Sequence, residues 1–385
     1  MRILHTANTY APLLDGVAEV VRNICERLAR RGHEVHVATS ALPSGSLYAE
    51  LRGVHVHRFL VRGNVALGMH GEIEKYRDFV SSGNWDILVS HGLHTWPTDA
   101  VLNRIGEYPW PSVLVTHGLV DEHPVFREYY STIPRRILNY SKWIRVSSCS
   151  GEASYSKTFN LPMPPVINNG VDMDEWSQPP IGLRSAWGVS NKPWVVNVSN
   201  HSPLKGHGVF FRLADSLRDL GAHFTLIAGS YPMAKWGLGW FGISGGCAYE
   251  CKLRSILSRD TVDLKMNRPR EEVVSAIKEA DLMVSTSRKE ANSLAVLESM
   301  AAGVPWVSFD VGSARENEGG VVARDFDEMR QVVTELARNP ELRRSLGSAG
   351  RAQVVAKHNW DRIVDEYEQV YESTVGQRSV VACQA

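Results

Sequence analysis

SRKEANSLAVLESMAAGVP, residues Ser287–Pro305, is the most informative stretch of this chain. It places Glu290 ahead of an expected helix and Glu298 inside that helix. The apolar run DLMVSTS, which starts at Asp281, comes directly before it and is typical of a short strand. The stretch therefore predicts a strand, a loop and a helix, with one carboxylate in the loop and another on the helix.

Both ends of the expected helix are marked in the sequence. Asn292 and Ser293 are residue types that cap helix N-termini, and Gly303 with Pro305 stops the helix. The free N–H groups of Asn292, Ser293 and Leu294, together with the helix dipole, form a site for phosphate. Carboxylates repel phosphate but accept hydrogen bonds from sugar hydroxyls. A nucleotide sugar therefore explains acids that flank an anion site better than a free phosphate does.

The E-x7-E spacing from Glu290 to Glu298, followed by LESMAAGVPWV, resembles the donor-site signature of retaining glycosyltransferases with the GT-B fold, in particular family four. The resemblance implies an α/β chain of two Rossmann-like domains that face each other across a cleft. In that family the first Glu lies by the transferred sugar and the second binds the ribose diol. Between them the family usually has Gly-Phe-Gly-Leu, where this chain has ANSL, which leaves the sugar open. An ordinary amphipathic helix flanked by two glutamates is the alternative.

Length and composition favour a two-domain protein of ordinary surface charge. The chain has 385 residues, with 42 basic and 42 acidic side chains, so nothing calls for nucleic acid or an acidic membrane as a partner. The scattered cysteines fit a reducing compartment. Cys247 and Cys251 are close in sequence, but without a second Cys or His pair nearby a zinc site is not expected. No signal peptide or transmembrane run is present, so a cytoplasmic protein is expected.

Residues 1–40 predict an opening βαβ unit: the strand RILHTAN, a helix over LLDGVAEVVRNICERLARRG and the strand HEVHVATS. Gly16 lets the backbone approach a ligand at the carboxyl end of the first strand, where open α/β sheets bind ligands, although a plain tight turn is the alternative. The stretch resembles the family's Gly-Gly-x-x-Glu loop, with Asp15 in place of the first Gly and Glu19 close to the acid.

Four further apolar runs, GVHVHRFL, WDILVSHG, SVLVTHG and WIRVSSCS, predict more strands of a parallel sheet. Two of them end in histidine, at His91 and His117, on the edge where ligands collect. His117 resembles the family's histidine that faces the donor sugar. Both are predicted site residues, and a structural role is the alternative for each.

The run IPRRILNYSKWIRV mixes basic and aromatic residues. It either contacts the head group of a lipid acceptor or forms a solvated helix face, and the second interpretation is favoured. Peripheral membrane contact is expected only if the acceptor is a lipid.

The proline-rich segment NLPMPPVINNGVDMDEWSQPP predicts the crossing between domains, and its NNGVD core resembles a family sequence just before the linker. We expect an acceptor domain over residues 1–175 and a donor domain over residues 176–359. A terminal helix over about 360–376 is expected to pack back on the first domain. Asp172 and Asp174 spell Asp-x-Asp, a metal motif in other glycosyltransferases, but inside a linker it is interpreted as coincidence and no metal is expected.

The second half repeats the α/β pattern from WVVNVSN onward. Lys205, just after a strand end, can supply a point charge to a diphosphate leaving group. In the family an arginine usually stands five positions earlier, where this chain has Asn200, so half of the usual cationic clamp is absent. Either Asn200 and the neighbouring backbone serve instead, or the leaving group is held less tightly. By resemblance, the backbone around Met266 and Asn267 meets the nucleotide base.

The glycine-rich segment between Gly229 and Leu253 is longer than the expected connection. Gly237, Gly239 and Gly242 spell GxGxxG, but the motif does not directly follow a strand, and Trp240 crowds the pyrophosphate side, so NAD binding is not favoured. A lid over the cleft is the favoured interpretation, with local packing as its alternative.

The sequence therefore predicts a retaining glycosyltransferase that moves a sugar from a nucleotide diphosphate donor to a hydroxyl acceptor such as a glycan, glycolipid or small metabolite. A UDP-sugar is the first expectation and a GDP-sugar the second, with no metal and no cofactor. The expected catalytic residues are Glu290, Lys205 and His117. A phosphorylase or epimerase of the same fold, a non-catalytic nucleotide-sugar-binding protein and, more remotely, an NAD oxidoreductase are the alternatives.

Overall fold

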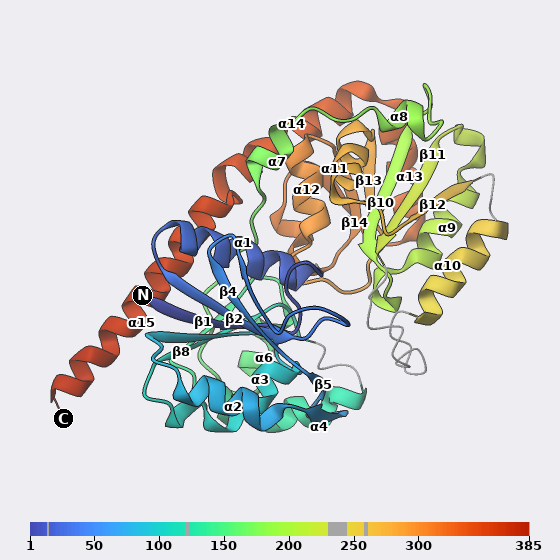
Figure 1. The fold of residues 1–385 in the computed structure, drawn as a ribbon. Helices are drawn as coiled ribbons and strands as arrows, with labels where there is room; N and C mark the ends of the chain where they lie inside the picture. The colour runs from blue at the N-terminus through green and yellow to red at the C-terminus, as the bar shows by residue number, and fades with distance from the viewer. Residues whose placement is uncertain (14, 120–123, 230–244, 258–260, 385) are drawn as a thin grey trace. The chain divides into compact units, whose positions relative to one another are not determined.

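The computed structural model describes residues 1–385 apart from 14, 120–123, 230–244, 258–260 and 385. The chain forms two compact units (Figure 1). The first consists of Met1–Asn169 with Trp360–Ala385, and the second of Gly170–Asn359. The sequence predicts a domain boundary at residue 175 and a terminal helix that packs on the first domain.

The first unit is built on a sheet whose described strands lie in the order β3-β4-β2-β1-β7-β8-β9. All neighbours are parallel except β3 and β4, which are antiparallel. The strands are β1 (Arg2–Thr6), β2 (Glu34–Ser40), β3 (Tyr48–Leu51), β4 (Val54–Phe59), β7 (Ile87–His91), β8 (Ser112–Thr116) and β9 (Lys142–Arg145), and a separate hairpin is formed by β5 (Val61–Asn64) and β6 (Gly68–Gly71).

Helices connect these parallel strands, as the alternating pattern predicts. They are α1 (Gly16–Arg30), α2 (Ile73–Ser82), α3 (Trp96–Val101), α4 (Pro124–Thr132), α5 (Pro134–Ile137) and α6 (Gly151–Thr158), with the 3₁₀ turn η1 (Leu102–Glu107). The basic and aromatic run does not form a single solvated helix face. It divides into the short helix α5 and the strand β9, where Trp143 is buried because its strand carries it into the core.

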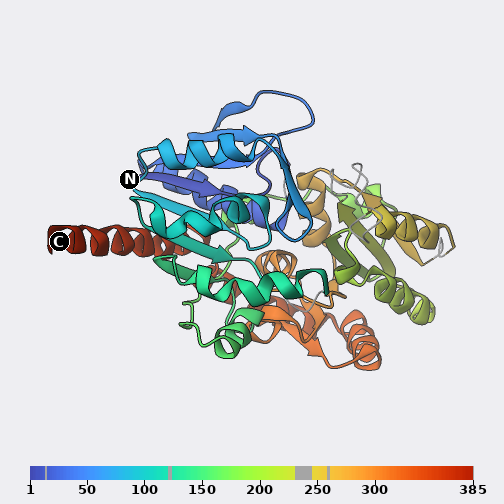
Figure 2. The same ribbon diagram turned by 90° about the horizontal axis from the view of Figure 1, so that it is seen from below.

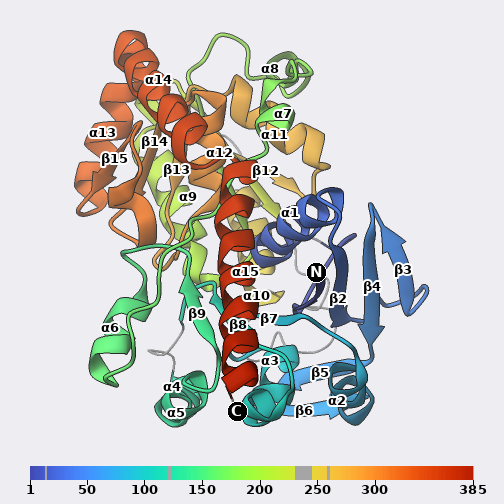
Figure 3. The same cartoon turned by 90° about the vertical axis from the view of Figure 1, so that its left-hand side faces the viewer.

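The long terminal helix α15 (Trp360–Gln384) packs against α1 within this unit, and its last turns extend beyond the sheet (Figures 2 and 3). Ion pairs join the two helices: Arg27 lies 3.1 Å from Asp361, and Arg31 lies 2.7 Å from Glu368. The buried side chains of this helix include Trp360, Ile363, Val364, Tyr367 and Tyr371, whereas Val370 is partly exposed.

The second unit contains a parallel sheet whose described strands lie in the order β12-β11-β10-β13-β14-β15. They are β10 (Trp194–Asn200), β11 (His223–Gly229), β12 (Val262–Met266), β13 (Leu282–Ser285), β14 (Trp306–Phe309) and β15 (Gly320–Ala323). The helices are α7 (Met173–Ser177), α8 (Leu183–Ala186), α9 (His207–Ser216), α10 (Gly245–Leu257), α11 (Arg270–Glu279), α12 (Leu294–Ala302), α13 (Phe326–Arg338) and α14 (Pro340–Lys357), with 3₁₀ turns η2 (Pro203–Lys205), η3 (Arg218–Leu220) and η6 (Gly312–Glu316).

Separate apolar cores cover the two faces of this sheet. One includes residues of α11 and α12, and the other includes residues of α9 and α13. A sheet buried on both faces explains why its strands read as continuous apolar runs rather than alternating ones. Both units are thus Rossmann-like, which confirms the predicted fold class.

Two further predictions concern the glycine-rich segment and membrane-spanning helices. The GxGxxG glycines Gly237, Gly239 and Gly242, and most of the expected lid, lie outside the described residues. No helix in the described part of the chain has both the length and the apolar character that crossing a bilayer requires.

Candidate active site

The strand, loop and helix expected around Glu290 and Glu298 are present as β13 and α12. Ser293 is the N-cap of α12, and its side chain accepts a hydrogen bond from the backbone N–H of Val296. Gly303 ends the helix in the left-handed region, with φ of 71°. The predicted caps are confirmed, so the N-terminus of α12 opens at the carboxyl end of β13, the edge at which open α/β sheets bind ligands.

Two predicted catalytic residues are in direct contact. The Nζ of Lys205 lies 2.6 Å from Oε1 of Glu290. The two side chains are 27% and 13% exposed, so the pair is partly shielded from water and its attraction is stronger than that of a surface pair. Lys205 is the last residue of the 3₁₀ turn η2, which follows β10 and precedes α9.

Backbone contacts hold the Lys205 turn against the end of β13. Thr286 Oγ1 donates to the carbonyl of Lys205 at 3.1 Å, and the N–H of Arg288 donates to the carbonyl of Leu204 at 2.7 Å. Gly206 has φ of +63° and approaches so closely that an added Cβ would lie 2.1 Å from the Thr286 carbonyl oxygen. Only glycine combines that dihedral with that approach.

The loop that carries Glu290 is held from the other side by η6. The N–H of Ser313 donates to the carbonyl of Ala291 at 2.9 Å. Gly312 has φ of +54°, and a Cβ there would lie 2.5 Å from the Ala291 carbonyl oxygen and 2.7 Å from that of Glu290. A segment about twenty residues further along the chain therefore fixes the backbone beside the first acid.

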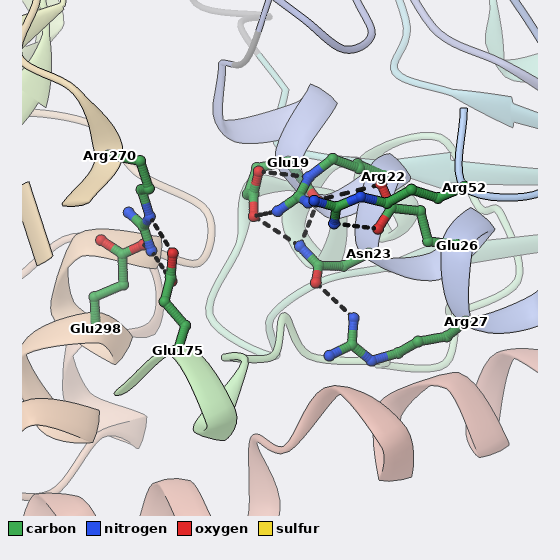
Figure 4. Close-up of polar contacts among 9 residues, drawn as sticks. All are labelled: Glu19, Arg22, Asn23, Glu26, Arg27, Arg52, Glu175, Arg270 and Glu298. Atoms are coloured by element: carbon green, nitrogen blue, oxygen red, sulfur yellow. Dashed lines mark hydrogen bonds and ion pairs between the residues drawn. The ribbon is translucent and has the colours of Figure 1, made fainter. Parts of the chain in front are cut away.

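Glu298 is held by an arginine that sequence analysis did not single out (Figure 4). Arg270 Nη2 lies 2.7 Å from Oε1 of Glu298 and 2.6 Å from Oε2 of Glu175. Burial acts to lower the pKa of the Arg270 guanidinium, but the charges of Glu298 and Glu175 outweigh burial and raise it. The arrangement fixes the orientation of Glu298, whose side chain is 11% exposed.

The remaining predicted donor-site residues lie along the same sheet edge. Asn200 is the last residue of β10, and a Cβ at Gly229 would lie 2.8 Å from its Oδ1. Met266 ends β12, and Asn267 follows it with φ of 50° and donates its N–H to the carbonyl of Ala228 at 3.0 Å. Asn292 is buried in the loop before α12.

In the first unit, His91 and His117 belong to a row that also contains His5. Nδ1 of His5 lies 2.9 Å from Nε2 of His91, and Nδ1 of His91 lies 3.0 Å from Nε2 of His117. The rings are stacked, with centroids 5.2 and 5.3 Å apart. The row crosses β1, β7 and β8, which are neighbours in the sheet, at their carboxyl ends.

These histidines are held in their neutral form. Burial lowers the pKa of His5 from 6.5 to about 3 and that of His117 to about 4. Burial, followed by repulsion from the two neighbouring rings, lowers the pKa of His91 well below 6.5. Removing imidazolium from water is costly, so the neutral form is favoured in the fold.

Neutral rings give the row a direction. Each hydrogen bond needs one N–H and one lone pair, so all donors point the same way. If they pointed toward His5, its buried Nε2–H would have no acceptor, because that atom has no hydrogen-bond partner among the described residues. An orphaned N–H is costly, so we assign donation from His5 through His91 to His117. His117 then carries its hydrogen on Nδ1, at the end of the row.

Polar contacts, rather than a close approach at glycine, hold the start of α1 in place. Asp15 caps α1 by accepting from the N–H of Ala18 at 2.8 Å. Glu19 accepts from Arg22 and from Asn23, as Figure 4 shows. An added Cβ at Gly16 would meet no described atom within 4 Å, so packing does not require glycine there.

The first aspartate of the Asp-x-Asp pair has a structural role. The carboxylate of Asp172 accepts from the backbone N–H of Asp174 at 3.2 Å and caps the short helix α7. This cap accounts for an acid at position 172.

Sequence reasoning missed Arg270, Glu175, Gly312 and His5 as parts of the candidate site. His5 carried one usable signal, since it stands near the end of the first strand as His91 does in β7. The others lie far along the chain from their partners, and no local pattern marks them.

The chain is similar to known glycosyltransferases. Residues 14–175 match the family model Glycosyltransferase Family 4, and residues 212–369 match the model Glycosyl transferase-like. An uncharacterized glycosyltransferase of Methanocaldococcus jannaschii is 25% identical over 97% of this chain and 98% of the relative. The GDP-mannose:cellobiosyl-diphosphopolyprenol alpha-mannosyltransferase of Xanthomonas oryzae is 23% identical over 98% of both.

Solved structures share the fold. Sucrose-phosphate synthase from Thermosynechococcus elongatus superposes with a TM-score of 0.80 at 17% identity, covering 97% of this chain and 99% of that one. Fold and family matches together indicate a glycosyltransferase of the GT-B type. Within that class the first part of the chain matches glycosyltransferase family 4, which the sequence motifs also resemble.

Proposed function

We propose that the protein transfers a sugar from a nucleoside diphosphate sugar to a hydroxyl acceptor with retention at the anomeric carbon. The observation that carries the proposal is the ion pair of Lys205 and Glu290 beside the N-terminus of α12. A cation and a row of backbone N–H groups at one sheet edge fit a diphosphate, and the carboxylate between them fits a sugar hydroxyl.

Lys205 has the main electrostatic role in this mechanism. Charge accumulates on the departing diphosphate in the transition state, where a pre-positioned cation and helix N-terminus stabilise it most. Glu290 holds the Lys205 ammonium in place at 2.6 Å before the donor binds. When the diphosphate draws the ammonium toward it, Glu290 is released to accept hydrogen bonds from the sugar.

Glu298 binds the ribose diol. A carboxylate accepts hydrogen bonds from two vicinal hydroxyls only if both oxygens face them, and the contact with Arg270 fixes that orientation. Met266 and Asn267 present backbone groups to the base, and Asn200 takes the place of the second cation. Arg270 is therefore a positioning residue rather than a catalytic one.

His117 acts on the sugar as a neutral hydrogen-bond donor through its Nδ1–H. Within the row, His5 contacts His91 and His91 contacts His117 through their ring nitrogens, and only the buried Nε2 of His5 has no partner among the described residues. These contacts fix the orientation of the His117 ring. The acceptor binds mainly to residues 1–170. Whether retention proceeds by a covalent intermediate or by front-face attack is a matter for trapping experiments.

The diphosphate needs no divalent ion in this proposal, because Lys205 and the α12 N–H groups neutralise its charge. Turnover is therefore expected to be the same with and without added Mg²⁺ or Mn²⁺. The donor is a UDP-sugar or a GDP-sugar. The relative from Xanthomonas oryzae is named for GDP-mannose and a lipid diphosphate acceptor, so both belong in the substrate panel.

The test begins with donor binding. The melting temperature is measured with UDP, GDP, ADP, TDP and NAD, since a ligand at a hundred times its Kd adds about 2.7 kcal/mol of stability. One nucleoside diphosphate should stand out, and its sugars are then tried with hydroxyl acceptors, with the product anomer read by NMR. A shift with NAD alone would overturn the proposal. Dependence on free phosphate would indicate a phosphorylase, and binding without turnover across the panel a non-catalytic protein.

A further inference from the structure

Three buried side chains of the second unit form a cluster that the proposed mechanism does not use. His201 directly follows β10, His207 begins α9, and Cys251 lies on α10. One ring nitrogen of each histidine and the Sγ of Cys251 all lie within 4.8 Å of one another. The side chains are 0%, 3% and 2% exposed, so water does not compete for them.

A chain of hydrogen bonds fixes which nitrogen of His207 carries its proton. Thr286 Oγ1 donates to the carbonyl of Lys205, so it accepts from Asn197 Nδ2 at 3.3 Å. Asn197 Oδ1 then accepts from Ser199 Oγ at 2.9 Å. Because the hydroxyl hydrogen of Ser199 is donated to Asn197, Ser199 Oγ can only accept in its 2.8 Å contact with His207. Nε2 of His207 therefore carries the hydrogen and donates it. The Nδ1 of His207 is therefore a lone pair.

That lone pair points at a thiol. Nδ1 of His207 lies 3.3 Å from Sγ of Cys251. In a tetrahedral zinc site, the bond lengths to imidazole nitrogen and thiolate sulfur place the two ligand atoms about 3.5 Å apart. The observed separation is thus close to that of two ligands of one ion, and the second ring nitrogen is already bonded to a hydroxyl, as metal-bound histidines usually are.

His201 brings a second lone pair. Its Nε2 lies 3.0 Å from Sδ of Met266, a weak acceptor, which assigns the hydrogen to Nε2. Its Nδ1 is buried and has no hydrogen-bond partner among the described residues. Buried acceptors without donors are rare and call for an explanation such as a bound ion.

The Nδ1 of His201 is the atom of this cluster that has no hydrogen-bond partner among the described residues. A cation bound by one nitrogen of each ring and by the thiolate would contact all three side chains at once. Two imidazoles and a thiolate are the ligand set that Zn²⁺ prefers, whereas Mg²⁺ and Ca²⁺ require oxygen.

We propose that His201, His207 and Cys251 bind a zinc ion. The Cys251 thiol loses its proton to solvent when it binds Zn²⁺, so loading releases a proton from this cysteine. Sequence analysis dismissed zinc here because it sought a histidine pair near the cysteines, and the histidines stand more than forty residues earlier.

The ion has a structural rather than a catalytic role. It ties α10 to the end of β10 and the start of α9, and the turn between them carries Lys205. In Figure 1, α9 and α10 lie beside each other in this unit. The ion is thus expected to order the turn that presents Lys205. This goes beyond the proposed function, which holds or fails independently of the metal.

The test is the metal content of the full chain, expressed without a polyhistidine tag in zinc-supplemented medium. Elemental analysis should find about one zinc per chain in the unmodified protein. Cys251→Ser and His207→Ala should lose it. Cys149→Ser, which removes an exposed cysteine of the other unit, should retain it.

A second measurement applies if the variants fail to fold. Cobalt replacing zinc in the unmodified protein should give the intense visible bands of tetrahedral geometry and a thiolate charge-transfer band. Proton release on zinc loading, measured by calorimetry in two buffers, should be about one proton per chain for a single ligating thiol, and Cys251→Ser should abolish it. Zinc at background level together with no thiolate band overturns the proposal. Nucleoside diphosphate binding, measured separately, decides the proposed function.

Discussion

The carboxyl edges of the two sheets have the same architecture but differ in charge: one carries neutral side chains and the other carries ion pairs. In the first unit, His5, His91 and His117 are buried side by side and kept neutral. In the second unit the edge is built from charges, of which Lys205 with Glu290 is the central pair. One Rossmann-like frame thus offers uncharged donors in one copy and paired ions in the other. The difference shows that charge at this edge is set by a few side chains, not by the fold.

The contrast fits the two halves of a nucleotide sugar. A sugar hydroxyl is neutral, and a neutral imidazole can bind it without attracting competing anions. A diphosphate carries charge that must be balanced, and the ion pairs of the second unit provide cations already held in place. The predictions below test this division of roles.

The largest effect is expected at Lys205. Lys205→Ala should lower kcat by about a hundred- to a thousandfold while the donor affinity changes little, because the charge on the leaving group is greatest in the transition state. Steady-state kinetics with the preferred donor measure both. Lys192→Ala, at an exposed lysine of the same unit, is the control. Unchanged turnover in Lys205→Ala would remove this residue from the mechanism.

Acid should destabilise the neutral row. A histidine whose pKa is lowered in the fold contributes its full stability above the unfolded pKa of 6.5 and loses it as the pH falls toward the folded pKa of about 4 or below. Each such histidine adds about 1.4 kcal/mol per pH unit to the loss. Denaturation midpoints between pH 7 and pH 5, compared at constant salt, give the slope.

His91→Asn should make the dependence of the unfolding free energy on pH shallower by about 1.4 kcal/mol per pH unit, because one neutral histidine is removed. His70→Asn, at an exposed histidine of the same unit, should leave it unchanged. Equal slopes in all three proteins would contradict the neutral row.

Gly312→Ala should cost about 2 kcal/mol or more in the free energy of unfolding. The new Cβ would meet the carbonyl oxygens of Ala291 and Glu290 at a positive φ of 54°. Gly221→Ala is a matched control, because its φ is 68° and nothing lies within 4 Å of the added Cβ among the described residues. It should cost about 1 kcal/mol. Equal losses would show that the contact with the Glu290 loop is unimportant.

A smaller effect is expected at Arg270. Arg270→Ala should weaken donor binding about tenfold with little change in kcat, because Glu298 loses the contact that orients it toward the ribose. Arg270→Lys should recover part of the loss, since a point charge replaces the planar guanidinium. If the donor affinity stays unchanged in Arg270→Ala, Glu298 does not depend on this contact.

The sequence predicted those parts of the molecule that local patterns encode. The caps of α12 at Ser293 and Gly303, the alternation of strands and helices, and the placement of Lys205 and Glu290 after strand ends all follow from neighbouring residues. The strand β9 was predicted from WIRVSSCS, but the basic run that overlaps it was interpreted as one helix face, because a mixed pattern does not separate the short helix α5 from an edge strand.

Contacts between distant segments could not be predicted. Arg270 reaches both Glu298 and Glu175, and η6 supports the loop of Glu290 through Gly312. Nothing in the spacing of these residues marks the partners. The buried cluster around Cys251 was missed for the same reason, since strand register and helix packing bring His201 and His207 to it.

Gly312 packs closely against the carbonyl of Ala291, in the loop that carries Glu290. The position of this loop therefore depends on backbone contacts as well as on its side chains. Because this contact is made by backbone atoms, the side chain at 291 can change without displacing Glu290, whereas Ser293 is needed to cap α12. This accounts for a chain that keeps both acids while replacing the first Gly of the usual sequence with Ala291. It also makes position 291 a natural target for directed evolution of donor preference, with Gly312 left untouched.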